Sequence, residues 1–432
     1  MSTNSPSSPD RDAPPRLRRP NRKQFRVQPL TIDELIPEDH PARAVWAVVQ
    51  RFDLSLFLQH IRARGPVPGR NATDPQLLVA LWLYAATQNV GCGRELAKLC
   101  VDRDPYEWLC GGVTVNYHTL NDFRVGHEAA VDDLLTQMLA ILTRAGVVSL
   151  DREAQDGTRV RASAGSGSFH RKETLEAHLR LAREHLEALK QAAADPALSA
   201  QQRAGRERAA RERQGRLEQA LLELEEIEQA KAQQKDKPSK DRPARASSTD
   251  PEARLMRMSD GGTRPAYNVQ LSTDCSSRAI IGVEVTNAGS DVGQDEPMRA
   301  QVEQRIEEAI AEQLTDGNYV TLEGIDRAAS EGVTVYMPVP KPRKEGVDPH
   351  KPKPTDSESV AEWRERMGTE AAQDIYRERG STIETVNGEL KERRGLDPLL
   401  VRGLKKVRCV ALWSALAYNL VHLAPALLDN WE

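Results

Sequence analysis

The sequence predicts a mixed α/β protein whose N-terminal part is all-helical and whose α/β domain contains an inserted helical hairpin. Helical apolar spacing runs from residue 31 to about residue 147. Short apolar runs bounded by turn residues follow at 146–163 and again from residue 266. Between these two groups lies a leucine seam with the spacing of packed helices.

Composition narrows the class of protein. A chain of 432 residues is long enough for two or three domains, and 39% hydrophobic with 29% charged residues excludes a fully disordered chain. The net charge is −4, so any binding of nucleic acid has to come from local basic patches. The five cysteines form no C-x-x-C pair, which argues against a thiolate zinc site and fits a reducing cytosol.

The sequence predicts a soluble, cytoplasmic protein with no membrane partner. The first twenty residues are polar and proline-rich and do not resemble a secretory signal. The most apolar stretch, 407–428, contains Arg408, Asn419 and His422, so it fits a buried helix better than a membrane span.

Residues 1–28 are expected to form a disordered basic arm. The stretch 16–26 carries six basic residues and no acidic one. It is either a solvated tail or an arm that binds a nucleic-acid backbone, and composition alone does not decide between them.

Residues 29–147 are expected to form a small helix-turn-helix-like domain. Thr31 and Glu34 have the spacing of a capping box, and Pro41 marks a helix start. Asp74 caps the apolar helix that follows it. Several such short helices joined by tight turns suit a compact bundle.

One short segment of this region, 116–124, presents polar side chains that could contact DNA. Asn121 and Arg124 are of the types that read base edges or bind phosphates. The same types are common on any exposed helix, so the alternative is an ordinary solvated surface.

The α/β part is expected at 148–170 and 250–432. A hairpin of strands at 266–274 and 279–286 is followed by a helix at 294–311, a helix at 321–330 and a strand at 333–339. The intervening residues 171–249 are assigned to an inserted helical hairpin and its linker.

The hairpin prediction depends on a seam of apolar residues. Its members step by four and three along the chain and resume after a break at Asp195-Pro196. The seam consists of Leu175, Leu179, Ala182, Leu186 and Leu189, then Leu217, Leu221 and Leu224.

Carboxylates near strand ends are candidate metal ligands, because phosphoryl chemistry with divalent ions needs hard oxygen donors from several elements. Asp156 and Asp316 are each followed by glycine, but Asp-Gly is also the commonest tight-turn dipeptide. Asp151 and Asp274 compete with them, and spacing does not choose among the four.

A third candidate carboxylate lies in the glycine-containing stretch near residue 384. If this stretch is helical, Arg377, Glu384 and Lys391 share one face, because they recur at seven-residue intervals. Gly380 and Gly388 lie beside Glu384 and leave it unobstructed. The alternatives are a salt-bridged surface helix or a strand.

Several segments, in this order, resemble bacterial insertion-sequence transposases of the DDE type. The resemblance is to the group with a Tyr-Arg-Glu-Lys signature and a helical insertion after the first aspartate. The segments are "AQDGTRVRASAG" (154–165), "PAYNVQLSTD" (265–274), "LTDGNY" (314–319) and "YRERGSTIETVNGELKERRG" (376–395). Stretches 29–43, 116–127 and 402–423 resemble the N-terminal domain and tail of the same group.

The resemblance implies that the helical domain at 29–147 binds DNA. It also implies an RNase H-like catalytic domain with a catalytic and metal-binding triad of Asp156, Asp316 and Glu384. The expected cofactor is Mg²⁺ or Mn²⁺, as two ions. The signature departs from the family in one place: four residues, not three, separate Arg379 from Glu384, whereas the six between Glu384 and Lys391 fit.

The implied function is metal-dependent DNA cleavage at element ends followed by strand transfer into target DNA. Tyr376, Arg377, Arg379 and Lys391 would contact DNA. The expected partners are terminal inverted repeats and target DNA in a bacterial nucleoid, bound by a homo-oligomer, most simply a dimer. Two alternatives stay open: a catalytically inactive DNA-binding protein on the same fold, and a metal-dependent nuclease without strand transfer.

Two more arginines follow the first aspartate of the triad. Arg159 and Arg161 would lie at a strand edge, where they meet DNA or remain solvated.

Overall fold

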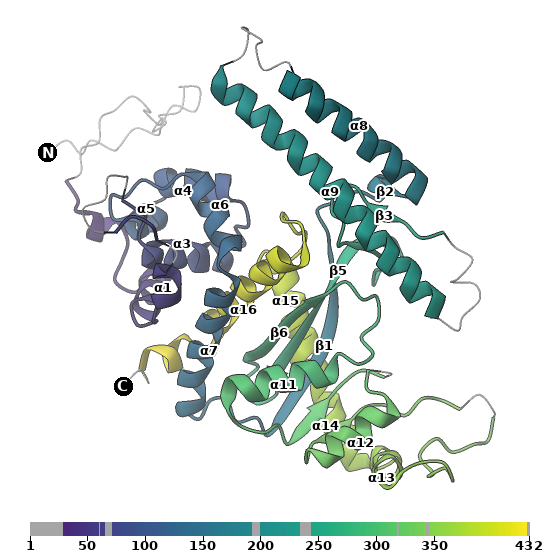
Figure 1. The fold of residues 1–432 in the computed structure, drawn as a ribbon. Helices are drawn as coiled ribbons and strands as arrows, with labels where there is room; N and C mark the ends of the chain where they lie inside the picture. Colours follow the sequence, from purple (N-terminus) through teal and green to yellow (C-terminus); the bar gives the residue numbers. More distant parts are fainter. Residues whose placement is uncertain are drawn as a thin grey trace, which may run out of the picture.

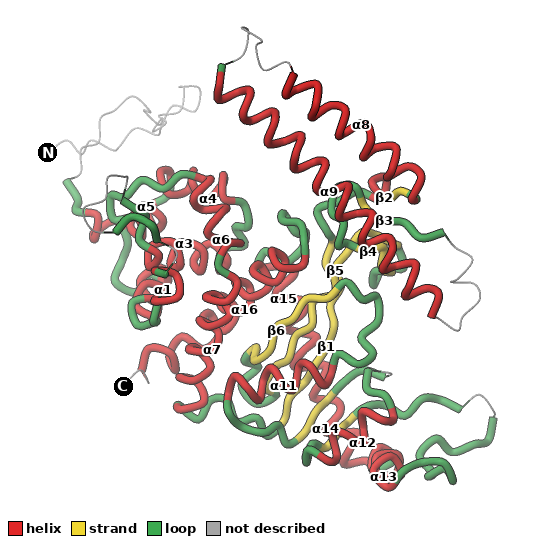
Figure 2. The backbone as a smooth tube through the Cα atoms, in the orientation of Figure 1, coloured by secondary structure: helices red, strands yellow, loops and turns green. Residues whose placement is uncertain are grey.

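The computed structural model describes residues 29–59, 61–64, 71–191, 199–233, 243–317, 319–342 and 345–429. The predicted basic arm and the break at Asp195-Pro196 lie outside these ranges. Figure 1 shows a helical N-terminal part, a sheet flanked by helices, and a long helical pair that extends from the sheet. Coloured by secondary structure, the strands gather in the middle of the molecule (Figure 2).

The N-terminal part is helical, as predicted. Its elements are η1 (Ile32–Leu35), α1 (Pro41–Val49), α2 (Ser55–Leu58), α3 (Pro75–Thr87), α4 (Gly93–Asp102), α5 (Asp104–Cys110), α6 (Tyr117–Gly126) and α7 (Glu128–Arg144). The backbone N–H and hydroxyl of Thr31 both donate to Glu34, each at 2.8 Å. Pro41 and Pro75 begin their helices, and Asp74 caps α3. The local start signals therefore predicted these elements correctly.

The main sheet is mixed. Its strands are β1 (Arg152–Arg161), β4 (Arg254–Arg257), β5 (Thr263–Asp274), β6 (Ile280–Thr286), β7 (Glu312–Leu314) and β8 (Thr334–Tyr336). The order is β4-β5-β1-β7-β8, and β6 also pairs with β5. β1 is antiparallel to β5 and parallel to β7, and β7 is parallel to β8. The predicted hairpin is present as β5 and β6.

Helices connect and cover these strands. They are α11 (Asp295–Ile306), α12 (Leu322–Ser330), α13 (Glu358–Met367), α14 (Glu370–Arg379), α15 (Thr385–Arg393) and α16 (Leu404–Asp429), with a π turn, η3 (Gly380–Glu384), between α14 and α15. The helix predicted at 294–311 is shorter than expected, because Glu307 adopts a left-handed conformation (φ 62°) that ends it. The strand predicted at 333–339 is limited to Thr334–Tyr336.

The inserted pair consists of α8 (Lys172–Gln191) and α9 (Ala200–Gln233). Leu175, Leu179, Ala182 and Leu186 of the predicted seam are buried, together with Leu217 and Leu224. Arg183 of α8 pairs with Glu218 of α9 at 2.9 Å. The pair starts after β2 (Phe169–His170) and returns to β3 (Ala246–Ser247), which is antiparallel to β2. This small two-stranded sheet closes the base of the pair.

Helix α16 joins the helical part to the sheet. It is long and apolar enough to cross a membrane by length and composition, but 67% of its most apolar window is buried inside the protein. It packs against α3, α7 and β6. The indole of Trp413 donates to the Arg124 carbonyl at 3.0 Å, and Asn419 exchanges two hydrogen bonds with the backbone of Ile280 (2.8 and 2.9 Å). The expected buried helix is therefore confirmed.

The Asn419 side chain satisfies both backbone groups of Ile280 at the start of β6, and all of these atoms are buried. Asn419→Leu keeps a similar volume but leaves a buried N–H and a buried carbonyl without partners. We expect it to lower the free energy of unfolding by about 2–4 kcal/mol in urea denaturation. Val421→Ala, on an exposed part of the same helix, is the control, and equal stability of the two variants would contradict the prediction.

Candidate active site

Asp156 lies on β1, and Asp316 follows the end of the neighbouring parallel strand β7 at the matching distance from a paired position. Ala154 of β1 pairs with Leu314 of β7, and two residues further along each chain come Asp156 and Asp316. Glu384 is contributed by a different element, the π turn η3. Three carboxylates thus come from a central strand, the end of its neighbour and a helical segment.

Asp156-Gly157 is not a tight turn, because both residues lie inside β1. Gly157 is required there for space: a Cβ atom would lie 2.1 Å from the Asp291 Oδ1 and 2.4 Å from the Gln270 Nε2. The competing Asp274 has a local role, since its Oδ2 accepts hydrogen bonds from Ser276 and Ser277 in the hairpin turn. These positions separate Asp156 from the turn-forming aspartates.

The segment around Glu384 is helical but contains a wider turn. The π turn takes in one residue more than an α-helical turn, at the place where the signature has one residue too many. The Thr382 hydroxyl bonds the carbonyls of Glu378 (2.9 Å) and Arg379 (3.1 Å), and so satisfies groups beside the wide turn. An uninterrupted helix was therefore the wrong expectation.

The wide turn changes which cation accompanies Glu384. Arg377 pairs with Asp374, three residues earlier, and its side chain is 70% exposed. Arg379 instead lies against the carboxylates, with its Nη2 3.0 Å from Asp156 Oδ1 and its Nη1 3.0 Å from Glu384 Oε1. The predicted shared face of Arg377 and Glu384 is corrected accordingly, because the i→i+5 hydrogen bonding of the π turn shifts the register by one position.

Asp156 is the most strongly perturbed member of the group. Burial raises its pKa to about 6, and the charges of Asp291 and Asp316 add to this, while Arg379 opposes it. Its second oxygen accepts a hydrogen bond from Asn387 of α15 at 2.9 Å. The carboxyl group is thus held on both sides within a mostly buried position.

Two further signature residues lie around these carboxylates. Burial lowers the pKa of Lys391, which the charges of Asp397 and Asp156 oppose. Burial raises the pKa of Tyr376, and the charges of Asp316 and Glu384 contribute. Tyr376 and Lys391 therefore both lie close enough to the carboxylates for their charges to interact.

The structure adds two residues that the sequence analysis did not select. Asp291 accepts hydrogen bonds from Asn268 (2.6 Å) and Gln270 (2.7 Å), two buried amides of β5, and it lies directly over Gly157. Asn387 bonds Asp156, as described above. The signal for Asp291 was present in β5, where polar side chains alternate through a strand that is otherwise apolar. Nothing in the sequence linked that alternation to Asp291, which lies 21 positions after Gln270 and 23 after Asn268.

The two residues of the helical part that were predicted to contact DNA differ in exposure. Asn121 is exposed on α6 and lines a depression of about 630 Å³ that also contains Arg94 and Lys406. Arg124 is 7% exposed, donates to the Gly91 carbonyl and stacks on the Trp82 ring at 4.8 Å. Arg124 therefore contacts the interior of the helical part, although it also lines the depression that contains Asn121, and its contact with DNA stays a prediction.

Arg159 and Arg161 at the strand edge also have partners within the protein. Arg159 donates to the carbonyls of Arg257 and Gly289, both at 2.9 Å. Arg161 pairs with Asp397 at 3.1 Å.

The three carboxylates are chemically suited to a divalent ion, although their side chains are not arranged around a common ion position. Among the described residues, no three His, Cys, Asp or Glu side chains form a group that could hold a metal ion. Carboxylate oxygens of Asp156, Asp316 and Glu384 are the ligands that Mg²⁺ and Mn²⁺ prefer. The buried amide oxygen of Asn387 has no hydrogen-bond partner within the described structure, and the nitrogen of the same amide donates to Asp156. The Arg379 guanidinium bridges two of the carboxylates.

The raised pKa of Asp156 predicts a pH dependence of stability. The folded protein holds this proton up to about pH 6, whereas the unfolded chain loses it near 3.8, so stability should fall as pH rises between these values and level off above them. Asp156→Asn removes this dependence. Relative to the unchanged protein, its free energy of unfolding should rise by about 2–3 kcal/mol over the interval, measured by urea unfolding at several pH values.

The matched control for this measurement is Asp260→Asn. Asp260 is exposed, and its hydrogen bond from Arg264 lowers its pKa to about 2, so its contribution changes with pH in the opposite sense. A constant difference between Asp156→Asn and the unchanged protein across the interval would contradict the assigned pKa.

Comparison with known families gives two matches. Residues 30–125 match the family described as "Transposase domain (DUF772)", and residues 348–424 match the "Transposase DDE domain". The second range contains Glu384, whereas Asp156 and Asp316 lie outside both. No curated protein and no solved structure matches the chain. The two matches agree with the resemblance found in the sequence, and they indicate an insertion-sequence transposase of the DDE type.

Proposed function

We propose that this protein cuts DNA at the ends of its own element and joins the freed 3′ ends to target DNA. The observation that carries the proposal is that Asp156 and Glu384 both contact the Arg379 guanidinium, while Asp316 follows the parallel strand beside Asp156 and its charge acts on both Asp156 and Arg379. A carboxylate on a solvated surface keeps a pKa close to its ordinary value. Burial raises the pKa of Asp156, so this residue fits a functional site better than a solvated surface.

The strand order supports an RNase H-like catalytic domain. β5 is antiparallel to both β1 and β6, and β1, β7 and β8 are parallel neighbours. In this assignment residues 148–170 and 250–432 form the catalytic domain, 29–147 the DNA-binding domain and 171–249 the insertion. The first carboxylate then lies on the central strand and the second after its parallel neighbour.

The chain's own residues would bind and orient the phosphodiester. Mg²⁺ or Mn²⁺, when held by Asp156, Asp316 and Glu384, supplies charge for activating water and for stabilising the leaving oxygen. Lys391 and Tyr376 lie on the same helical segment as Glu384 and would hold phosphate oxygens. Arg379 balances the carboxylates in the free protein and would transfer its hydrogen bonds to phosphate when the carboxylates take up a cation.

A second candidate is a DNA-binding protein without cleavage activity. One observation favours it: Arg379 fills the space between two carboxylates that a cation would need. Under this candidate the guanidinium is a permanent structural partner. DNA binding by the helical part would be unchanged.

Incubation of the purified protein with a labelled terminal inverted repeat and Mg²⁺ tests the proposal. We expect cleavage at the element end and joining to a plasmid. Asp156→Asn, Asp316→Asn and Glu384→Gln should each slow cleavage by at least about 100-fold, because each removes a charged oxygen ligand, while binding changes little. Glu392→Gln, exposed on the same helix, is the control.

Each other outcome selects an alternative. Binding without any cleavage supports the inactive protein, and cleavage without joining supports a nuclease. Cleavage by Asp156→Asn or Glu384→Gln at the rate of Glu392→Gln would refute the site assignment.

The position of Arg379 leads to a separate prediction about metal affinity. Arg379→Gln removes the cation that neutralises Asp156 and Glu384, so free protein should bind Mn²⁺ about tenfold more tightly in calorimetry without DNA. Arg377→Gln is the control, because Arg377 is exposed and pairs with Asp374. Equal Mn²⁺ affinity in the two variants would show that the guanidinium does not compete for the site.

A further inference from the structure

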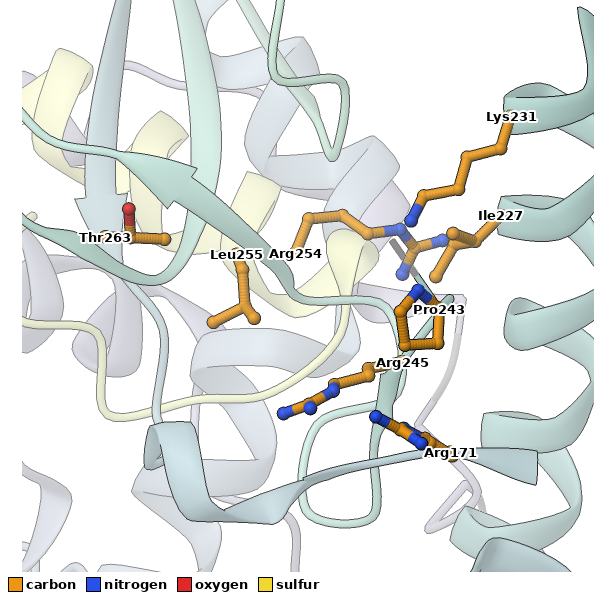
Figure 3. Close-up of a pocket in the computed structure, with 8 residues that line it drawn as sticks. All are labelled: Arg171, Ile227, Lys231, Pro243, Arg245, Arg254, Leu255 and Thr263. Carbon is orange, nitrogen blue, oxygen red and sulfur yellow. The ribbon is translucent and has the colours of Figure 1, made fainter. Parts of the chain in front are cut away.

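Cationic side chains surround a depression of about 500 Å³ where the inserted helices meet the edge of the main sheet (Figure 3). Arg171 precedes α8, Lys231 lies near the end of α9, Arg245 precedes β3, and Arg254 begins the edge strand β4. Ile227 completes one wall from α9. Four segments that are distant in sequence therefore bring positive charge to one place.

The depression carries more positive charge than the protein neutralises. No acidic residue is among those described as lining it. Arg254 pairs with Glu223 of α9 at 2.5 Å, whereas Arg171 and Arg245 form no ion pair within the described ranges. The pKa of nearby His170 is lowered, by burial first and then by His178 and Arg245. An anion bound here would relieve repulsion that the folded protein otherwise retains.

Strand pairing also fixes the distance between this depression, called the pocket below, and Asp156 on β1. Arg254 pairs with Ala266, and Ala266 pairs with Arg161, which is five residues after Asp156 along β1. Five strand residues and two strand spacings give a separation of roughly 20 Å between Asp156 and the pocket edge. Along duplex DNA this corresponds to about six base pairs.

We propose that this pocket binds backbone phosphates of the element-end DNA, about six base pairs from the cleaved bond. The proposal rests on the proposed function in that DNA is the ligand, and it gives the insertion a role in holding the duplex. Guanidinium groups suit phosphate oxygens because they donate two parallel hydrogen bonds. The exposed Arg171 and Arg245 make the contact, while Arg254 stays paired with Glu223.

The test is the salt dependence of DNA binding by full-length protein, measured without metal so that cleavage does not contribute. The double variant Arg171→Gln/Arg245→Gln should reduce the slope of log K against log[salt] by about 1–2, since each lost phosphate contact removes about 0.9. Arg206→Gln/Arg213→Gln is the matched control, because it removes the same charge from exposed positions of α9 outside the pocket.

Phosphate ethylation interference gives the position of the contact. Ethylation about six base pairs from the cut should weaken binding of the unchanged protein but not of the pocket variant. Equal slopes for the two double variants, with both proteins folded by thermal unfolding, would overturn the proposal. So would calorimetric binding of inorganic phosphate to the pocket with no change in the DNA slope, which indicates a small-anion site.

The salt dependence of DNA binding is measured without metal, so its outcome does not depend on whether the protein cleaves DNA. If the unchanged protein binds the repeat without cutting it, the proposed function fails but the pocket is still tested by the slope. If it cuts the repeat and the pocket variant keeps the full slope, the pocket proposal fails alone.

Discussion

A carboxyl group that is mostly buried in the middle of a sheet has to be compensated, and the arrangement around Asp156 follows from that requirement. One oxygen lies against Arg379 and the other accepts from Asn387. Even so, burial keeps the pKa of Asp156 near 6. Both partners belong to one continuous helical segment. When this segment packs on β1, it therefore also brings the two side chains that compensate the charge of Asp156.

The π turn makes that packing compatible with the sequence. Arg379 and Glu384 are five residues apart, so a regular helix would place their side chains about 140° apart around its axis. The wider turn accommodates the additional residue, and the Nη1 of Arg379 lies 3.0 Å from the Oε1 of Glu384. The poor helix propensity of this stretch, with its glycine and β-branched residues, is therefore consistent with a turn that must depart from regular geometry.

Local signals predicted the elements, and tertiary contacts decided the site. Caps at Thr31 and Asp74, the hairpin β5-β6 and the seam of α8 depend on neighbours in sequence, and each was read correctly. The burial of Arg124 was not predictable in this way, because it depends on the fold bringing Trp82 and Gly91 to it. The prediction that Arg377 and Glu384 share one helix face was wrong, because it assumed a uniform α-helix and the π turn interrupts it.

The insertion is placed by the same strand that carries the first carboxylate. β1 runs from Arg152 through Asp156 to Arg161, and the chain then enters β2 and α8 within about ten residues. The return through β3 to β4 attaches the other end of the pair beside β5. Both attachments are made to strands of one sheet, so the base of the insertion has a fixed distance from Asp156. For a chain of net charge −4, concentrating unpaired arginines at that base gives DNA a local site without a basic surface overall.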